Sequence, residues 1–223
     1  ECADGLRKNG IVVVEDFISP ETCDEILSEW KKLEGVLKSH SEDYYETDDF
    51  LYKSIDKPPK TYDEYAKFSK AVINHRFGTS DDGMMDIFHV DKLLHGSRPV
   101  KEKMAHGIPK KIIEACTRKP IYPSSLNMYY NRSVQKTRGL HFDTLAEDYK
   151  AFVYLTDVTR IEDGPYNYVP ASQGSKLLRL NKLYNRFFHG EGRNSDATFF
   201  SDKEAVPMLG KRGTLIISAQ NGV

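Results

Sequence analysis

The feature of the sequence that most limits its fold is a change of pattern at Pro120. Before this residue, apolar side chains recur at three- and four-residue steps, the spacing of helices that bury one face. After it, short β-prone runs are separated by Gly, Pro, Asn or Asp. Helices followed by strands predict an α+β protein: a mainly β core, a sandwich or barrel, supported by N-terminal helices.

The best-supported helix of the N-terminal half starts at Pro20. Ser19 supplies an N-cap and Pro20 suits the first helical position. The stripe that follows includes Trp30 and Cys23, which we expect to be a buried free thiol. The acidic, tyrosine-rich stretch 41–56 predicts an exposed loop or lid. The other elements predicted before Pro120 are helices over 3–8, 61–77 and 101–117 and a strand over 11–17.

The C-terminal half is predicted to hold strands and one insert. The insert spans 177–201, and we expect it to help select the substrate together with the loop over 41–56. No internal repeat or linker divides the sequence, so we expect a single domain over residues 1–223. The predicted strands cover 125–130, 140–144, 151–158, 166–169 and 213–218.

Composition excludes several classes of protein. The 32 basic and 33 acidic side chains give a net charge of -1, without the basic excess of a nucleic-acid binder. No apolar run approaches the roughly 18 residues of a membrane span, so we expect neither nucleic acid nor a membrane as a partner. Three cysteines without a CxxC pair, and no signal peptide, indicate a reducing, cytoplasmic setting. The oligomeric state has no signal in the sequence.

The most informative motif for chemistry is His141-Phe142-Asp143. On a strand, alternation places His141 and Asp143 on one face and Phe142 on the other. An imidazole and a carboxylate so placed can occupy adjacent positions on one metal ion. A second histidine from a distant strand would complete the 2-His-1-carboxylate triad of non-haem Fe(II) oxygenases. A His-x-Asp tripeptide by itself also occurs among ordinary surface and core residues.

The order of motifs around this tripeptide resembles the phytanoyl-CoA dioxygenase family of Fe(II)/2-oxoglutarate oxygenases. A strand with Leu155-Thr156-Asp157 follows the His-x-Asp, and a Gly164-Pro165 turn leads to Val169-Pro170-Ala171-Ser172-Gln173. In that last element the usual Gly and His of the family are replaced. The opening Asn9–Ser19 is also similar to the family's first strand and its entry to a helix. The resemblance extends from residue 9 to residue 218.

The resemblance implies a double-stranded β-helix (jelly-roll) core, Fe(II) held by His141 and Asp143, and 2-oxoglutarate as cosubstrate. It also implies that the strand before the motif contributes to the 2-oxoglutarate pocket. Alternation on that strand puts Asn127, Tyr129 and Asn131 on one face, which makes them the candidate cofactor-binding residues. A solvated sheet edge is the alternative interpretation of the same three residues.

The family's distal histidine follows a strand of the type Gly213–Ser218, and the 2-oxoglutarate-binding arginine comes after that histidine. In this sequence no residue up to Val223 occupies either position. Three explanations stay open: the C-terminal strands lie beyond Val223, the protein is a degenerate relative, or His189 substitutes for the distal histidine. The resemblance therefore implies a dioxygenase hydroxylating a small-molecule substrate, with a non-catalytic β-helix binding protein as the alternative.

Overall fold

The computed structural model describes residues 1–38, 44–55, 69–78, 81–131, 134, 137–189, 193 and 195–223. These residues form two compact units, each assembled from separate stretches of the sequence. The first unit comprises Glu1–Cys23, His106–Ile121 and Gly139–Val223, and the second comprises Asp24–Ala105 and Tyr122–Arg138. The single domain expected over residues 1–223 stays a prediction.

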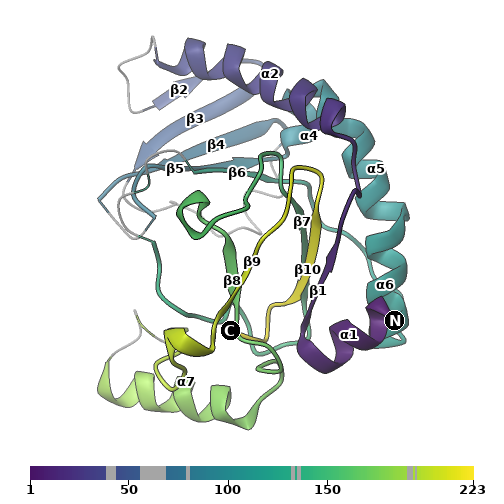
Figure 1. The fold of residues 1–223 in the computed structure, drawn as a ribbon. Helices are drawn as coiled ribbons and strands as arrows, with labels where there is room; N and C mark the ends of the chain where they lie inside the picture. Colours follow the sequence, from purple (N-terminus) through teal and green to yellow (C-terminus); the bar gives the residue numbers. More distant parts are fainter. Residues whose placement is uncertain are drawn as a thin grey trace. The chain divides into compact units, whose positions relative to one another are not determined.

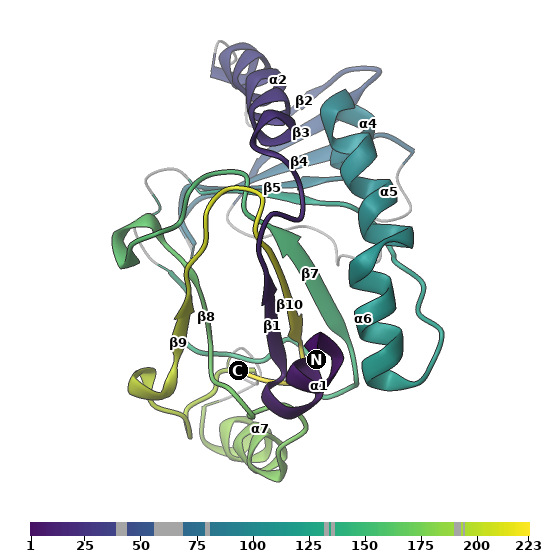
Figure 2. The ribbon, with the colours of Figure 1, turned by 45° about the vertical axis from the view of Figure 1, so that its right-hand side comes forward.

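The first unit is built on a three-stranded antiparallel sheet in the order β1 (Ile11–Val14), β10 (Leu215–Ala219), β7 (Tyr149–Val153) (Figure 1). Every residue of the central strand β10 is buried, and the strand has a hydrogen-bonded neighbour on each side. In the same unit, α1 (Cys2–Asn9) lies beside α6 (Ile108–Thr117), and Arg7 donates to the carbonyl of Ala115 at 2.9 Å (Figure 2).

A second, two-stranded sheet of this unit pairs β8 (Tyr166–Tyr168) with β9 (Val206–Met208). Side chains of both sheets meet in one buried cluster of Ile11, Tyr168, Met208 and Ile216. Helix α7 (Lys176–Phe188) and the 3₁₀ turns η2 (Ile161–Asp163) and η4 (Asp202–Glu204) complete the unit. Over the described residues the strands do not close into a barrel, so the double-stranded β-helix stays a prediction.

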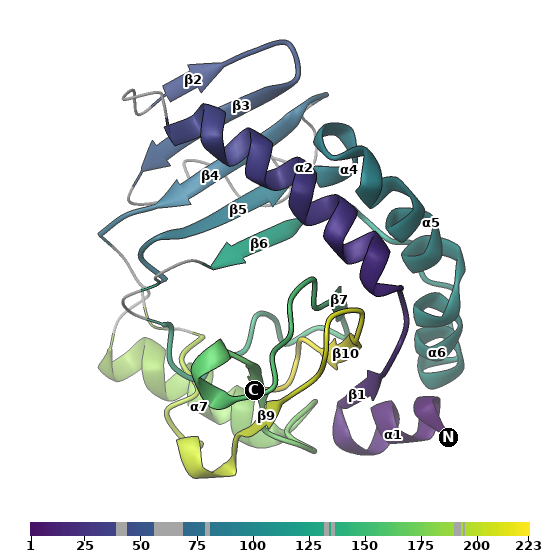
Figure 3. The same ribbon diagram turned by 45° about the horizontal axis from the view of Figure 1, so that its top comes forward.

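The second unit holds a five-stranded sheet in the order β2-β3-β4-β5-β6, with helix α2 (Pro20–Lys38) across one face from Asp24 onward (Figure 3). The Trp30 ring of α2 lies 5.1 Å from the Tyr130 ring, whose hydroxyl donates to Glu34 at 3.3 Å. The strands are β2 (Tyr44–Glu46), β3 (Phe50–Ile55), β4 (Ala71–Arg76), β5 (Met84–Phe88) and β6 (Met128–Asn131); α4 (Val90–Leu93), η1 (His95–Ser97) and α5 (Arg98–His106) follow β5.

The elements with the clearest sequence signals are confirmed. Helix α1, strand β1 and helix α2 occupy the predicted places, and Cys23 is a fully buried thiol outside any disulfide. The later strands β6, β7, β8 and β10 also fall within or beside their predicted ranges. The α+β class is therefore confirmed, although α7 shows that the helices are not confined to the N-terminal half.

Two predictions in the second unit are wrong. The exposed loop expected over 41–56 contains β2 and β3, whose Phe50 and Leu51 are buried. The helix expected over 61–77 is wrong at residues 71–76, which form strand β4. Residues 61–68 of that prediction lie outside the described residues. Strand β4 pairs with β3 on one side and β5 on the other, and this tertiary pairing outweighs a weak helical spacing around Val72 and Ile73.

Two further boundaries differ from the sequence prediction. The single helix expected over 101–117 is divided at Gly107 into α5 and α6, with Pro109 in the first turn of α6. The strand expected over 140–144 is reduced to one isolated bridge between His141 and Asp196. No helix among the described residues is both long and apolar enough to cross a bilayer.

The turn before β10 gives a test of this fold. Gly213 has φ +87°, accepts backbone hydrogen bonds from Phe17 and Ile18, and would bring an added Cβ into overlap with the Ile18 carbonyl oxygen. Gly164 has φ +74° but open space around an added Cβ. We expect Gly164→Ala to cost about 1 kcal/mol of unfolding free energy through backbone strain alone.

Gly213→Ala should cost roughly 1–3 kcal/mol more, because overlap with a fixed carbonyl is added to the same strain. Urea unfolding of both variants measures the difference. Equal losses of stability in the two variants would contradict the close approach of Gly213 to the carbonyl oxygen of Ile18.

Candidate metal and cosubstrate site

The His-x-Asp segment is held in place by backbone hydrogen bonds on both sides. On one side, Phe142 N–H donates to Ser195 at 3.0 Å and Ala197 N–H donates to Leu140 at 2.8 Å. On the other, the N–H groups of Asp143 and Thr144 both donate to the Gln220 carbonyl at 3.2 Å. The segment therefore lies between residues 195–197 and the chain that leaves β10.

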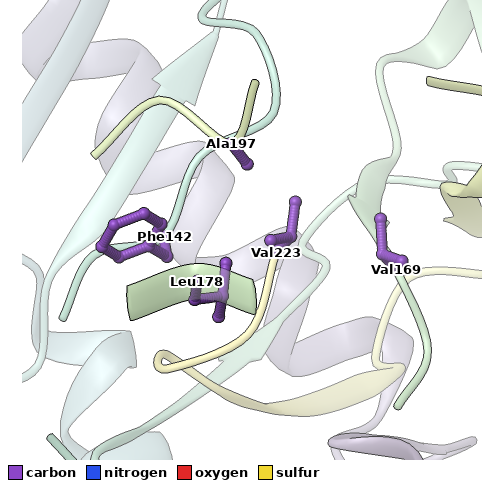
Figure 4. Packing of buried hydrophobic residues seen from close by; sticks show 5 residues of the cluster. All are labelled: Phe142, Val169, Leu178, Ala197 and Val223. Atoms are coloured by element: carbon purple, nitrogen blue, oxygen red, sulfur yellow. The ribbon is translucent and has the colours of Figure 1, made fainter. Parts of the chain in front are cut away.

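Phe142, the middle residue of the motif, anchors it in a buried apolar cluster. Figure 4 shows the Phe142 ring with Leu178 of α7 and with Val169, Ala197 and Val223. Phe142 is 2% exposed, whereas His141 and Asp143 keep about a third of their side chains accessible. Burial of Phe142 thus turns the two polar side chains away from the apolar cluster, as alternation predicted, without a regular strand.

The imidazole of His141 and the carboxylate of Asp143 face each other. His141 Nδ1 lies 2.9 Å from the Gly139 carbonyl oxygen, which can only accept, so Nδ1 carries the proton. In the neutral ring, Nε2 then presents a lone pair, and it lies 3.5 Å from Asp143 Oδ1. An imidazole nitrogen and a carboxylate oxygen at this separation can be joined either by the proton of an imidazolium or by a metal ion.

Lys150 occupies the other oxygen of the same carboxylate. Its Nζ forms a close ion pair with Asp143 Oδ2, while Oδ1 is directed at His141. Lys150 lies on β7, opposite Ser218 of β10 in the strand register. The pairing of these two strands therefore brings a positive charge to the motif, a contribution that sequence reasoning missed.

Electrostatics keep Asp143 ionised. The imidazole of His141, followed by the ammonium of Lys150, holds the pKa of Asp143 well below its usual range, although partial burial acts in the opposite direction. A carboxylate that stays ionised at neutral pH and an imidazole nitrogen that faces it are a suitable pair of donors for a divalent metal.

A group of neutral polar side chains adjoins the carboxylate. The hydroxyls of Tyr166 and Ser218 lie 3.2 Å apart, and Gln220 Nε2 donates to Ser218 Oγ at 2.9 Å. Burial raises the pKa of Tyr166, and the negative charge of Asp143 adds to the effect. Ser218 and Gln220 were not predicted as site residues; the signal was a polar side chain at an inward position of an otherwise apolar strand.

The predicted cofactor-binding residues belong to the second unit. Tyr129 and Asn131 are exposed and share one face of β6, opposite Asp86 and Met84 in the register, as alternation predicted. Asn127 precedes the strand, and its Oδ1 accepts a hydrogen bond from the His89 backbone at 3.3 Å. Their role in binding 2-oxoglutarate stays a prediction.

A third protein ligand is not among the described residues, where no three His, Cys, Asp or Glu side chains cluster as a metal site. His189, considered as a substitute, is an exposed residue that ends α7, with its ring 5.5 Å from the Tyr184 ring. The chain does reach the motif at Val223, which packs in the Phe142 cluster and whose carbonyl accepts from Val169 at 2.6 Å.

Comparison with protein-family models gives a match over residues 6–219 to phytanoyl-CoA dioxygenase (PhyH). This chain belongs to the phytanoyl-CoA dioxygenase family. The family's enzymes use Fe(II) and 2-oxoglutarate, which agrees with the donor pair found at His141 and Asp143. The comparison with curated proteins finds no match.

Two solved structures have a fold similar to that of this chain. One is the epimerase SnoN in complex with Fe3+, alpha ketoglutarate and nogalamycin RO, with a TM-score of 0.53, 15% identity, and coverage of 99% of this chain and 73% of that one. Another is the non-heme alpha ketoglutarate dependent carbocyclase SnoK from nogalamycin biosynthesis, with a TM-score of 0.53, 14% identity, and coverage of 99% and 74%. At these identities the likeness shows the fold.

The ion pair of Lys150 allows a direct test of the site's electrostatics. Lys150→Met should raise the pKa of Asp143 toward the usual value of about 4, because the ammonium group that stabilises the ionised carboxylate is lost. An NMR titration of the Asp143 side-chain carboxyl carbon measures this change. Lys119→Met, which breaks the exposed pair with Glu147, is the control and should leave Asp143 unchanged. An unaltered Asp143 in Lys150→Met would contradict the pairing.

Proposed function

We propose that this protein is an Fe(II)- and 2-oxoglutarate-dependent dioxygenase that hydroxylates a C–H bond of a small-molecule substrate, with decarboxylation of 2-oxoglutarate to succinate. The observation that carries the proposal is the pair of facing acceptors, His141 Nε2 and Asp143 Oδ1, 3.5 Å apart in a member of this family. Two ligands at about 2 Å from one metal, in adjacent positions, lie roughly 3 Å apart, close to the observed separation.

The donor chemistry fits Fe(II). One imidazole nitrogen and one carboxylate oxygen are two members of the 2-His-1-carboxylate set, and both are accessible to solvent. When bound, the iron with 2-oxoglutarate and O₂ supplies the oxidant that removes a hydrogen atom from the substrate.

The residues around the motif orient its two donors. The Gly139 carbonyl fixes the His141 tautomer with Nε2 free, a supporting contact typical of metal-binding histidines. Lys150 engages Asp143 Oδ2, which leaves Oδ1 to bind the metal and favours a carboxylate that ligates through one oxygen. Phe142 and its apolar cluster exclude water from behind the motif.

A third protein ligand is left unassigned in this proposal, which rests on His141 and Asp143. Val223 shares the buried cluster of Phe142, so the described chain passes close to the motif at this point. Asn127, Tyr129 and Asn131 are proposed to contribute polar contacts to 2-oxoglutarate. The substrate is proposed to be a small molecule rather than a nucleic acid, and the setting cytoplasmic.

Oxidation can end in products other than an alcohol. SnoN is described as an epimerase and SnoK as a carbocyclase, so the shared fold accommodates different outcomes. The class of cosubstrate chemistry is therefore better supported than hydroxylation itself. Succinate formation tests the former, and incorporation of oxygen from O₂ into the product tests the latter.

Substitution of the two donors tests the metal site. His141→Ala and Asp143→Ala should each lower the affinity for Fe(II) at least tenfold, because each removes a ligand, and should abolish succinate formation by the full-length protein. Anaerobic calorimetry measures Fe(II) binding independently of turnover. His106→Ala is the matched control, because this exposed histidine belongs to the same unit and should change neither quantity.

Retention of Fe(II) binding and succinate formation in His141→Ala would overturn the assignment. Fe(II) binding by the full-length protein without succinate formation would instead favour the alternative, a non-catalytic binding protein on the same fold. Loss of activity in His189→Ala together with retention in His141→Ala would identify His189 as a ligand.

The predicted cosubstrate contacts have a separate test. Tyr129→Phe and Asn131→Ala should raise the KM for 2-oxoglutarate about three- to tenfold, since each removes about one hydrogen bond of 0.5–1.5 kcal/mol. The KM for O₂ and the Fe(II) affinity should not change. Tyr122→Phe, at an exposed tyrosine of the same unit, is the control. An unchanged KM in both variants would contradict the assignment of this face of β6.

A further inference from the structure

Helix α7 is fixed to the first unit through one side only. Leu178 lies in the Phe142 cluster, and Asn181 and Asn185 are fully buried. Both asparagine amides donate to the Asp196 carbonyl, at 2.5 and 2.7 Å. These contacts hold the helix firmly and determine which side of it faces outward.

The outward side carries large apolar side chains, which we call the α7 apolar face. Phe187 is 80% exposed, Phe188 71% and Leu180 57%, values far above those of a packed helix. The Tyr184 ring lies 4.8 Å from the Phe188 ring and 5.2 Å from Phe199, so the aromatic surface continues beyond the helix. The face comprises Leu177, Leu180, Leu183, Tyr184, Phe187 and Phe188. Contiguous exposed apolar surface of this kind marks an interaction site.

The charges on the same helix have a single sign. Its four charged residues are basic and exposed, and the helix has no Asp or Glu. In the part of the chain that the structure describes, none of the four forms an ion pair. The whole protein has a net charge of -1, so this concentration of positive charge is local. The basic residues are Lys176, Arg179, Lys182 and Arg186.

We propose that the α7 apolar face docks on an anionic lipid bilayer surface. An interfacial helix combines an apolar face, which enters the boundary between headgroups and acyl chains, with flanking Lys and Arg that contact anionic headgroups. The stems of Lys and Arg can lie along the apolar region while their charges reach the headgroups. The aromatic rings of Tyr184, Phe187 and Phe188 suit this boundary region.

Charge complementarity favours an anionic bilayer over a second copy of the chain. In a symmetric dimer through this face, two helices with four positive charges each would be brought together and would repel one another. An anionic surface has the opposite charge to these basic side chains and therefore attracts the helix. The sequence analysis led us to expect no membrane partner because no segment can span a bilayer, but surface binding needs only one amphipathic helix.

The test is sedimentation of the purified full-length protein with vesicles. We expect binding to phosphatidylcholine vesicles that contain phosphatidylserine, at least tenfold weaker binding to phosphatidylcholine alone, and weakening by salt. Arg179→Glu/Lys182→Glu and Leu180→Gln/Phe187→Ser should each reduce binding to the anionic vesicles about tenfold or more. Circular dichroism checks that these surface variants stay folded.

Matched controls change equivalent groups elsewhere. Lys31→Glu/Lys32→Glu reverses two exposed charges on α2, and Ile161→Ser removes a side chain that is 70% exposed. Both should bind vesicles like the unaltered protein. Absence of binding to anionic vesicles would overturn the proposal, as would equal losses in the control and α7 variants. Self-association that Leu180→Gln/Phe187→Ser abolishes, without vesicle binding, would assign the face to a dimer instead.

Discussion

The site of this protein depends on the backbone pairing between the His-x-Asp segment and the chain that leaves β10. The carbonyl of Gln220 accepts from both Asp143 and Thr144, immediately after the most deeply buried strand of the first unit. Because β10 is held between β1 and β7, the position of Gln220 is determined by the sheet. The motif thereby gains a fixed geometry without being a strand itself, and Phe142 adds apolar anchoring from the opposite direction.

Electrostatics then give this geometry its chemical character. The Nε2 nitrogen of His141 and an ionised oxygen of Asp143 face each other, and Lys150 binds the second carboxylate oxygen. The arrangement favours a bridging cation and limits the way in which the carboxylate can bind it. Membership of the phytanoyl-CoA dioxygenase family supplies the chemistry with which this donor pair agrees.

The sequence predicted what depends on local pattern. The capped helix α2, the entry strand β1, the buried Cys23 and the pairing of His141 with Asp143 all follow from periodicity, capping residues and motif order. Prediction from the sequence failed where contacts with residues distant in the sequence decide the conformation. Val72 and Ile73 suit a helix or a strand, and their place between β3 and β5 makes them a strand.

The sequence by itself therefore determined the family, the α+β class and the two candidate metal ligands, because these are carried by residue types in a fixed order. Only the tertiary structure decided that Lys150 reaches Asp143, since that contact comes from the register in which Lys150 lies opposite Ser218. It also decided which side of α7 is buried. The asparagine contacts to Asp196 turn the apolar residues outward, and a stripe of leucines and phenylalanines does not reveal that orientation.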